Sequence, residues 1–378
     1  MIRIAHMYSS MRKGGGAERS ILSILRGLDP ARFESFLILN DRKQPEHDLS
    51  DIEVLPPRCA KGEKPWWAEW RYALDVAHEV RRRKIGILHS HSETGHDRLA
   101  IMLGGMTGAA VIRTLRGVSP RKNTRTGTLA RLFDIHTASW TVISPGLIPA
   151  LETKYKVPRE KITIIPNGIN LEFYGKPSTD REIMRRKLGV SPDELLLLSA
   201  GRLAKVKDYP TILEALAKMR DNIGKMKLLI VGEGPERTLI EEKRKELHLE
   251  DIITLLGYRE DVPDLLAAAD VFVMASIREG FGRAAAEAMA AGCPVIGTDV
   301  PGLRFVLDDG NAGVVVPLRS PEKMAEALQS LIKNEDLRRD LGKKGRDRAW
   351  TIFSDGAMVQ QYQTLYERVM KKRGANHV

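Results

Sequence analysis

Short apolar runs alternate with segments of helical periodicity from one end of the chain to the other. Many of these runs are rich in β-branched residues, which is typical of strands buried on both faces of a parallel sheet. In the first half, the pattern predicts strands at 2–7, 36–39, 86–89, 111–115, 141–143 and 162–165. In the second half, it predicts strands at 195–200, 227–231, 252–255, 271–274, 294–297 and 313–316.

Strands separated by helices build βαβ units, so two groups of strands predict two doubly wound, Rossmann-like α/β domains. We expect an N-terminal domain at residues 1–175 and a C-terminal domain at 176–355. A final helix within 356–378 lies beyond the second sheet and could pack on either domain. A chain of 378 residues is long enough for two such domains.

The composition indicates a soluble protein of the cytoplasm. Cys59 and Cys293 are the only cysteines, which is too few for a disulfide framework. Met1 leads directly into the first expected strand and not into a signal peptide. The longest apolar runs are far shorter than the roughly 20 residues that span a bilayer.

The net charge of +11 is concentrated in the first half of the chain. Residues 1–175 hold 27 Lys and Arg against 18 Asp and Glu, an excess of nine, and the rest of the chain has an excess of two. A basic half favours an anionic partner, although a solvated charged face is an equal alternative. Nucleic acid is not the expected partner, because no finger or helix-turn-helix motif accompanies the charge.

Two glutamates, Glu279 and Glu287, flank a Gly-Phe-Gly turn at the start of a predicted helix. The backbone N–H groups of Gly280, Phe281 and Gly282 are suited to an anion, which the positive end of the helix dipole also attracts. A carboxylate on either side suits the hydroxyl groups of a sugar or a ribose. The combination indicates a binding site for a nucleotide sugar.

Two further loops carry groups suited to a diphosphate, with a plain polar turn as the alternative for each. Arg202 and Lys207 follow the expected strand 195–200, and the carboxyl end of such a strand faces the ligand. Arginine would bind phosphate through its planar fork and lysine as a point charge. In the first half, Gly15 and Gly16 open a helix after the first strand and permit close approach of a phosphate.

A third loop follows the expected strand 252–255. The ring of Tyr258 offers a face for a nucleotide base, and the backbone near Val262 could read the edge of that base. A plain loop is about equally consistent with the sequence.

The segment His89-Ser90-His91, with His96 close behind, contains ligand types that suit zinc. No other cluster of His, Cys or carboxylates at ligand spacing supplies the remaining ligands. We therefore expect no metal and interpret the segment as a polar lining of a binding surface or as plain structure.

Trp66, Trp67 and Trp70 precede the basic run 81–84 on a predicted amphipathic helix. Such a helix could contact an anionic membrane surface or a lipid-borne acceptor. It could equally pack on the first sheet, since basic residues at a helix C-terminus also complement the helix dipole.

Together these segments resemble the family 4 retaining glycosyltransferases, also called group 1, which have the GT-B fold of two Rossmann-like domains facing a cleft. The resemblance covers nearly the whole chain and is most specific in 279–298, which is similar to the paired-glutamate signature of that family. It is supported by 201–203 with Lys207, by 164–170 and by 15–18, all in the expected order.

The resemblance implies a donor that is a nucleotide diphosphate sugar, with UDP-sugars expected first and GDP-sugars next, bound mainly by the second domain. Arg202 and Lys207 would grip the diphosphate and Glu279 would contact the donor sugar, so these three are the expected catalytic residues. The chain has no Asp-x-Asp motif, and the two cations would replace a metal. No cofactor is expected.

The remaining binding roles follow from the same resemblance. The diphosphate is expected to contact the amides of Gly280, Phe281 and Gly282, and also Gly15 and Gly16. The ribose is expected to bind Glu287, and the base is expected to lie at Tyr258 and Val262. The acceptor, a saccharide or a lipid-linked saccharide, would lie against the first domain. The expected setting is surface polysaccharide or lipopolysaccharide assembly, with peripheral contact at the inner face of a membrane.

Arg116 departs from the family pattern, because many members have a sugar-facing histidine at this position. It could bind an acidic donor or acceptor, or assist the phosphates. Two other functions remain open from the sequence. One is a nucleotide-sugar 2-epimerase of the same fold, and the other is a non-catalytic protein that binds sugar or nucleic acid.

Overall fold

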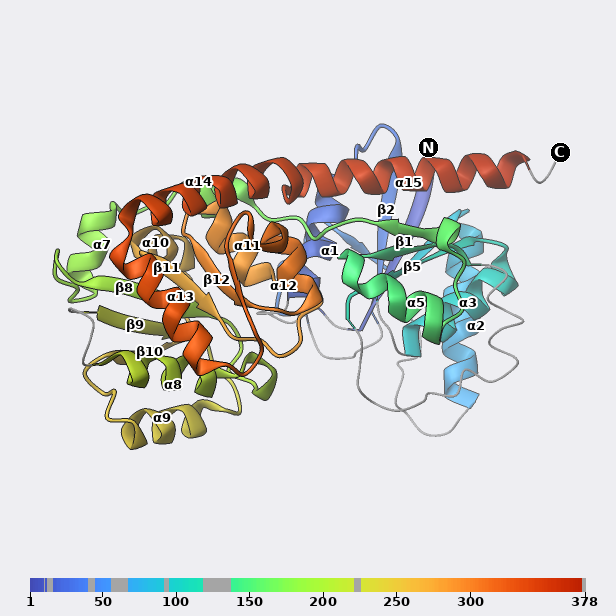
Figure 1. Cartoon of the computed structure of the whole chain (residues 1–378). Helices are drawn as coiled ribbons and strands as arrows, with labels where there is room; N and C mark the ends of the chain where they lie inside the picture. The colour runs from blue at the N-terminus through green and yellow to red at the C-terminus, as the bar shows by residue number, and fades with distance from the viewer. Residues whose placement is uncertain are drawn as a thin grey trace. The chain divides into compact units, whose positions relative to one another are not determined.

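The computed structural model describes residues 1–9, 11, 16–39, 45–55, 67–91, 95–117, 137–220 and 226–375. Contacts divide the chain into two compact units (Figure 1). Unit 1 comprises Met1–Gly168 and the segment that begins at Asp355, and unit 2 comprises Ile169–Ser354. The break after Gly168 lies ahead of the expected boundary at 175.

Unit 1 is built on a parallel sheet of seven strands in the order β3-β2-β1-β4-β5-β6-β7. Its strands are β1 (Ile2–Tyr8), β2 (Phe33–Leu39), β3 (Glu53–Val54), β4 (Ile87–Ser90), β5 (Ala110–Leu115), β6 (Thr137–Val142) and β7 (Ile162–Ile164). Its helices are α1 (Gly16–Gly27), α2 (Trp67–Arg82), α3 (Gly95–Thr107), α5 (Ile148–Lys154) and α15 (Asp355–Ala375), with short 3₁₀ turns at Pro145–Leu147 and Arg159–Lys161.

The alternation of side chains along β1 distributes them to two apolar layers. Ala5 and Met7 pack in the cluster that α2 and α3 supply, whereas Ile4 packs in the cluster formed with α1 and α15. His6 is on the same side as Ile4 and meets the ring of Tyr366 on α15. The first sheet is therefore covered by helices on both faces, as a parallel sheet requires.

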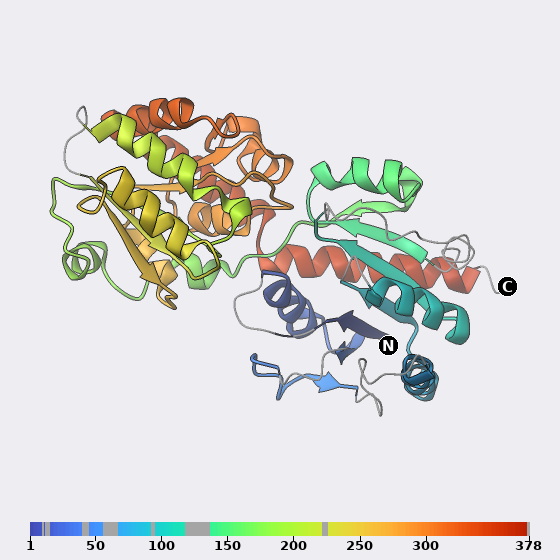
Figure 2. The same cartoon turned by 90° about the horizontal axis from the view of Figure 1, so that it is seen from below.

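Helix α15 completes the first unit although it follows the second unit in the sequence. Its buried residues, among them Tyr362 and Tyr366, belong to the same apolar cluster as Ile4 and Ile112 of the sheet. Figure 2 shows α15 lying across the strands of unit 1. The final helix, whose place was open from the sequence, thus packs on the N-terminal sheet.

Unit 2 is built on a parallel sheet of six strands in the order β10-β9-β8-β11-β12-β13. Its strands are β8 (Leu195–Ala200), β9 (Met226–Val231), β10 (Ile253–Gly257), β11 (Val271–Met274), β12 (Val295–Thr298) and β13 (Val314–Val316). Its helices are α6 (Leu171–Gly175), α7 (Arg181–Lys187), α8 (Tyr209–Met219), α9 (Arg237–Glu246), α10 (Val262–Ala268), α11 (Arg283–Ala290), α12 (Pro301–Val306), α13 (Pro321–Lys333) and α14 (Glu335–Ile352), with 3₁₀ turns η4 (Lys205–Lys207) and η6 (Asp308–Gly310).

All twelve strands expected from the sequence overlap strands of the structure. The additional strand, β3, has two residues, which pair with Phe36 and Leu37 of β2. So short an edge strand has no room for an apolar run, which is why the hydrophobic pattern does not reveal it.

Each sheet reverses its strand order once. In unit 1 the reversal lies between β1 and β4, and in unit 2 it lies between β8 and β11. Ligands of open parallel sheets bind beyond the carboxyl ends of the strands at such a reversal. The loops after these four strands are therefore where the fold places candidate functional residues. In the described part of the chain, no helix is both long enough and apolar enough to cross a membrane.

Candidate functional site

The candidate site of unit 2 is formed by the loops that follow β8 and β11. Lys207 ends the turn η4, and Glu279 lies just ahead of α11. The Lys207 Nζ donates a hydrogen bond of 2.6 Å to Glu279 Oε2, and the two side chains are 21% and 20% exposed. A main-chain bond of 2.9 Å from Ile277 N to Val206 O also joins the two loops. The structure therefore brings together two of the three residues expected to be catalytic.

The turn at 280–282 directly follows Glu279 and leads into α11, so the start of this helix lies next to Glu279. Gly282, the N-cap of α11, has φ 99°, a left-handed conformation that glycine adopts without strain. Because glycine has no side chain, the N-cap residue itself cannot cap the first N–H groups of the helix. These amides and the dipole behind them are suited to an anionic ligand.

Two packing contacts fix the position of this turn. A Cβ at Gly302 of α12 would lie 2.5 Å from Glu279 O and 2.8 Å from Phe281 N, so only glycine permits this close approach. The ring of Phe281 is 2% exposed and packs edge-on against the ring of Phe353. The expected role of Phe281 concerns its amide, and its buried ring anchors the turn that carries that amide.

Glu287 lies on α11, where it is 7% exposed. Its Oε1 accepts a hydrogen bond of 2.9 Å from Nε of Arg283, one helical turn earlier. The ion pair limits the orientation of the carboxylate that was expected to hold a ribose.

The other residues expected in the donor site lie at loop positions. Arg202 follows β8 and is exposed. Tyr258 follows β10 with 57% of its surface exposed, and Val262 is the first residue of α10. Strand β10 is separated from β8 by β9, so this loop is two strands away from the Lys207 loop. In unit 1, Gly16 begins α1, and Gly15 lies outside the described residues.

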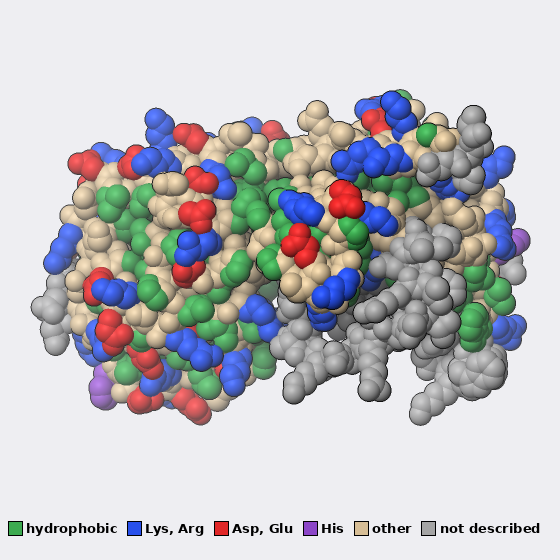
Figure 3. Space-filling view, turned by 45° about the vertical axis from the view of Figure 1, so that its right-hand side comes forward, with side chains coloured by type: hydrophobic (Ala, Val, Ile, Leu, Met, Phe, Trp, Pro, Cys, Tyr) green, Lys and Arg blue, Asp and Glu red, His purple; other side chains and the backbone are tan. Residues whose placement is uncertain are grey.

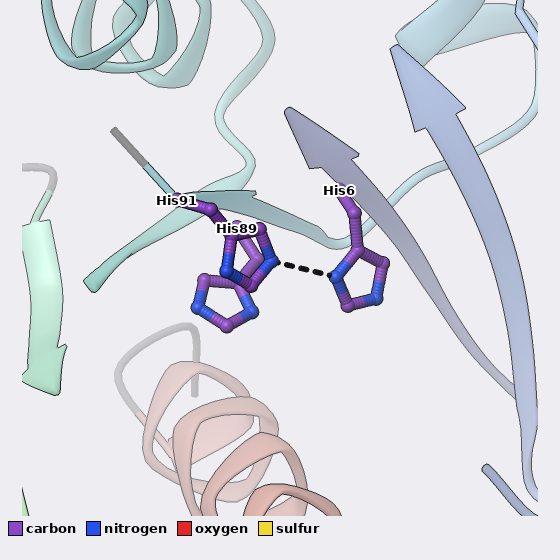
Figure 4. A group of neighbouring side chains, drawn as sticks. All are labelled: His6, His89 and His91. Atoms are coloured by element: carbon purple, nitrogen blue, oxygen red, sulfur yellow. Dashed lines mark hydrogen bonds between the residues drawn. The ribbon is translucent and has the colours of Figure 1, made fainter. Parts of the chain in front are cut away.

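Unit 1 contains a buried group of three histidines at the reversal of its sheet (Figure 4). His6 of β1 is paired in register with His89 of β4, and His91 follows β4. Ring nitrogens of the three lie within 4.8 Å of one another, and all three side chains are buried. No cluster at ligand spacing in the sequence supplies a third ligand beside His89 and His91, but the fold brings His6 next to them. His6 is far away in the sequence, and only the pairing of β1 with β4 reveals it.

The hydrogen bonds of Arg116 determine where the protons of this group lie. Arg116 Nη2 is 3.2 Å from His91 Nδ1, and a guanidinium can only donate, so this nitrogen carries no proton. Neutral His91 therefore carries its proton on Nε2 and donates it over 3.0 Å to His6 Nδ1. The proton of neutral His6 must then be on Nε2.

His89 belongs to a second chain of hydrogen bonds. Its Nδ1 is 2.7 Å from the hydroxyl of Tyr366, and its Nε2 is 2.7 Å from Oγ1 of Thr114. Thr114 Oγ1 is in turn 2.6 Å from Oγ1 of Thr141. Both nitrogens of His89 are thus engaged, and the chain ties α15 to three strands of the sheet.

These bonds do not fit a metal ion among the three histidines. A metal needs a lone pair on each ligand nitrogen, and His91 Nε2 uses its proton for the bond to His6. If a metal bound to His91 Nε2, the ring proton would have to move to Nδ1. The N–H group at Nδ1 would then face the N–H group of Arg116 Nη2, and the hydrogen bond between them would be lost. As arranged, His91 and His6 form a hydrogen-bonded pair of neutral imidazoles, and His89 lies beside them in its own chain of hydrogen bonds.

Burial keeps the three imidazoles neutral. Desolvation lowers the pKa of His6 to about 3. It also lowers the pKa of His89 and of His91 well below the usual value, and in both the positive charge of Arg116 adds to the effect.

Arg116 has a second partner on its other terminal nitrogen. Nη1 donates over 2.9 Å to Asn167 Oδ1, which also accepts a bond of 3.1 Å from Ser20 of α1. Four segments meet at this point: α1, the ends of β4 and β5, and the stretch after β7. The sequence singled out Arg116 but gave no role to Ser20 or to the side chain of Asn167.

Comparison with known proteins connects both units to one kind of enzyme. Residues 14–173 match the family model described as Glycosyltransferase Family 4, and residues 180–348 match the one described as Glycosyl transferases group 1. The N-acetyl-alpha-D-glucosaminyl L-malate synthase of Bacillus anthracis is 31% identical over 304 residues, which cover 79% of this chain and 79% of the relative.

Two further similarities are informative. The lipopolysaccharide core biosynthesis glycosyltransferase LpsE of Rhizobium meliloti is 30% identical over 181 residues, covering 48% of this chain and 52% of the relative. The crystal structure of Anabaena HepE in complex with UDP has a TM-score of 0.83 at 20% identity, covering 97% of this chain and 100% of HepE. The expected fold of two parallel-sheet α/β domains is confirmed.

The neutral histidines predict a loss of stability in mild acid. Between pH 6.5 and about 3, His6 stays neutral in the folded chain but is protonated in the unfolded chain. The free energy of unfolding should therefore fall as the pH falls through this range, by about 1.4 kcal/mol per pH unit for each such histidine. Denaturant unfolding of the chain at pH 7.5, 6.0 and 5.0 measures this slope.

The variant His6→Leu supplies the control. It removes one of the neutral imidazoles, so its stability should decline less steeply below pH 6.5, by about 1.4 kcal/mol per pH unit. The carboxylates titrate in both proteins and cancel in the comparison. Equal slopes for the two proteins would contradict the assigned protonation state.

Proposed function

Since this chain belongs to the group 1, family 4 glycosyltransferases, we propose that it is a retaining, metal-independent enzyme that uses a nucleoside diphosphate sugar. The observation that carries the proposal is the contact of Lys207 with Glu279 beside the start of α11, whose N-cap residue is a glycine. A cation, a carboxylate and a set of backbone amides are the groups needed for a diphosphate next to a sugar.

The Lys207–Glu279 pair has to open when the donor binds. The ammonium of Lys207 then exchanges its bond to the carboxylate for a bond to a phosphate oxygen, and Glu279 accepts hydrogen bonds from the sugar hydroxyls. Arg202 adds a second cation, and the amides of Gly280, Phe281 and Gly282 add donors. Negative charge grows on the leaving diphosphate while the sugar becomes oxocarbenium-like, so these groups stabilise the transition state.

Retention of configuration is compatible with this set of groups. The acceptor hydroxyl attacks the face that the diphosphate leaves, and a phosphate oxygen of the leaving group takes the hydroxyl proton. The C–O bond to the diphosphate breaks as the bond to the acceptor forms, so no side chain has to act as a base.

The similar proteins support the choice of substrates. HepE was crystallised with UDP, which favours a UDP-sugar as donor, with GDP-sugars next. LpsE is named for lipopolysaccharide core biosynthesis, which favours a saccharide or lipid-linked acceptor in the assembly of surface polysaccharides. In this reading Glu287 holds the ribose, Tyr258 and Val262 hold the base, and Gly15 and Gly16 approach the diphosphate.

Helix α2 is the part of the chain that we propose for contact with an anionic membrane surface. Trp70 and Leu74 of α2 are 54% and 56% exposed and lie one helical turn apart. Two of the basic residues at the end of α2, Arg82 and Arg83, form ion pairs with Glu79, which reduces their attraction for lipid. In Figure 3, most of the acidic side chains lie among basic ones on the left of the view, and the described charged side chains on the right are mainly basic.

Removing the ammonium of Lys207 should slow transfer. In Lys207→Ala, kcat with a UDP-sugar should fall by about 10²–10³, because a stabiliser of the leaving group is lost. The matched control is Lys205→Ala, which removes an exposed lysine from the same turn and should leave kcat near the wild-type value. Release of UDP, measured with each variant, checks this. Unchanged turnover in Lys207→Ala would show that the role is wrongly assigned.

The variant Glu279→Gln separates catalysis from simple binding. Turnover should fall while the Kd for the donor changes little, since the amide can still meet the sugar hydroxyls but carries no charge. Calorimetric titration of the donor alongside the rate measurement checks this. If the protein only binds sugars, neither the wild type nor the Glu279→Gln variant will turn the donor over.

Chelation should leave the activity almost unchanged. With Lys207 and Arg202 facing the diphosphate, treatment with EDTA followed by gel filtration should retain most of the rate of UDP release. The matched sample receives the same treatment and then Mg²⁺ or Zn²⁺. A loss of activity that either ion restores would contradict metal-independent transfer.

Membrane contact through α2 predicts binding to anionic vesicles that weakens as salt rises. The double variant Trp70→Ala with Leu74→Ala should bind less, whereas Leu239→Ala, which truncates an exposed leucine of α9, should bind as wild type does. Co-sedimentation with phosphatidylglycerol and with phosphatidylcholine vesicles measures this. Equal binding to both lipids would contradict an electrostatic contact between α2 and the membrane.

A further inference from the structure

We propose that the loop after β9 fixes the distance between the two loops of unit 2 that the proposed function assigns to the donor, with Gly234 as its positioning residue. Residues 201–207 are called the phosphate loop, 232–236 the spacer loop and 257–262 the base loop. The inference rests on the proposed function and adds that unit 2 recognises a nucleoside diphosphate as one unit of fixed span.

The spacer loop lies between the other two loops at one edge of the sheet. Strand β9 is flanked by β8 on one side and by β10 on the other, and all three strands are parallel. Their carboxyl ends therefore share an edge, where neighbouring strands are about 4.8 Å apart. The phosphate loop and the base loop thus begin roughly 10 Å apart. A donor that contacts both has to reach across the spacer loop.

Main-chain hydrogen bonds tie the spacer loop and the end of β9 to the phosphate loop. Gly201 N donates over 2.9 Å to the carbonyl oxygen of Val231, the last residue of β9. Leu203 N donates over 3.0 Å to Glu233 O, and Leu203 O accepts a bond of 3.0 Å from Glu236 N. The side chain of Leu203 is fully buried in an apolar core cluster of unit 2. The phosphate loop therefore cannot move away without withdrawing this leucine from the core.

The spacer loop is also tied to the base loop. Gly232 N donates over 2.8 Å to the carbonyl oxygen of Gly257, which directly precedes Tyr258. The carboxylate of Glu233 lies over Gly257, so that its Oε1 would be 2.9 Å from a Cβ at that position. The same oxygen accepts a bond of 2.7 Å from Nη1 of Arg237. Glu233 thus contacts the phosphate loop with its carbonyl group and the base loop with its side chain.

At Gly234 the spacing leaves no room for a side chain. A Cβ at this position would lie 2.1 Å from Leu203 O and 2.7 Å from the carbonyl carbon of the same leucine. Non-bonded heavy atoms pack at about 3.5–4.0 Å, and backbone atoms cannot rotate away as a side chain can. The φ of Gly234 is not positive, so an alanine there is opposed by this contact alone. It would force the two loops apart by roughly 1 Å.

A shift of that size matters because the donor is held at two points. Once the base occupies the base loop, the diphosphate meets Arg202 and Lys207 at a distance that the spacer loop has set. Two linked contacts support each other only when the geometry allows both at once. A misplacement of about 1 Å can cost on the order of 10²-fold when groups must be precisely positioned. Gly234 therefore acts on the donor through the phosphate loop.

Calorimetric titration of Gly234→Ala tests the inference apart from catalysis. UDP is the probe, replaced by GDP if the wild type binds only GDP. The Kd should rise by about 10- to 100-fold in this variant. The matched control is Gly356→Ala in α15, where a Cβ would meet no atom within 4 Å outside its own helix, so binding should equal that of the wild type. Melting temperatures show whether each variant is folded.

A double-mutant cycle with Lys207→Ala distinguishes positioning from a general defect. In a chain that already lacks the Lys207 ammonium, the phosphate loop has less to position. Gly234→Ala should then raise the Kd by no more than about threefold. A defect spread over the whole unit would raise the Kd by the same factor in both backgrounds.

Glu233→Ala keeps the inference testable if Gly234→Ala does not fold. It removes the side-chain contact with the base loop and leaves the main chain of the spacer loop intact. The matched control is Glu241→Ala, which removes the other carboxylate paired with Arg237 and the same amount of charge. The Kd should be about two- to fivefold higher in Glu233→Ala than in Glu241→Ala.

The outcomes separate this inference from the proposed function. If the wild type turns a donor over but Gly234→Ala and Glu233→Ala bind the nucleotide unchanged, the inference is wrong and the transferase proposal stands. If both variants lose affinity as expected but the wild type turns no donor over, the transferase proposal fails and the spacing stands. An equal effect of Gly234→Ala with and without Lys207 overturns the inference, and so does failure of the wild type to bind either nucleotide.

Discussion

The parallel arrangement of the strands is the constraint on which both candidate sites depend. Consecutive parallel strands must be joined by a crossover over one face, and a sheet that grows in both directions has to reverse its order once. At that reversal, loops that are far apart in the sequence lie side by side. The contact between Lys207 and Glu279 exists because β8 and β11 are neighbours, and the contact between His6 and His91 exists because β1 and β4 are neighbours.

The two units hold their charged groups in different ways. In unit 2, Lys207 is paired with a carboxylate that is itself exposed enough to exchange partners, which suits a site that has to open for its ligand. In unit 1, Arg116 donates hydrogen bonds to the amide oxygen of Asn167 and to the ring of His91. A charge neutralised by an ion pair is available to a ligand only after that pair breaks. This difference is consistent with separate roles for the two units.

The sequence predicts the parts of this structure that depend on local pattern. The strands of both sheets, apart from the two-residue β3, follow from apolar runs, and the turn at 280–282 follows from contiguous residues that carry their own chemistry. The sequence does not predict what depends on strand order. His6 could not be connected with His89 before their register was known, and Asn167 could not be connected with Ser20 and Arg116, which lie in distant segments. The proton positions of His91 depend on a donor on another strand, so no local pattern contains them.

Helix α15 has a consequence for how the protein is made. Tyr362 and Tyr366 fill the interior of the first unit, and they are synthesised after the whole of the second unit. Domains usually fold in the order of their synthesis, with the N-terminal one first. Here one face of the N-terminal sheet lacks part of its cover until α15 has been synthesised, whereas Ile169–Ser354 is complete before that point. The second unit can thus be folded before the first, and the open face of the first is the surface that a chaperone would meet during translation.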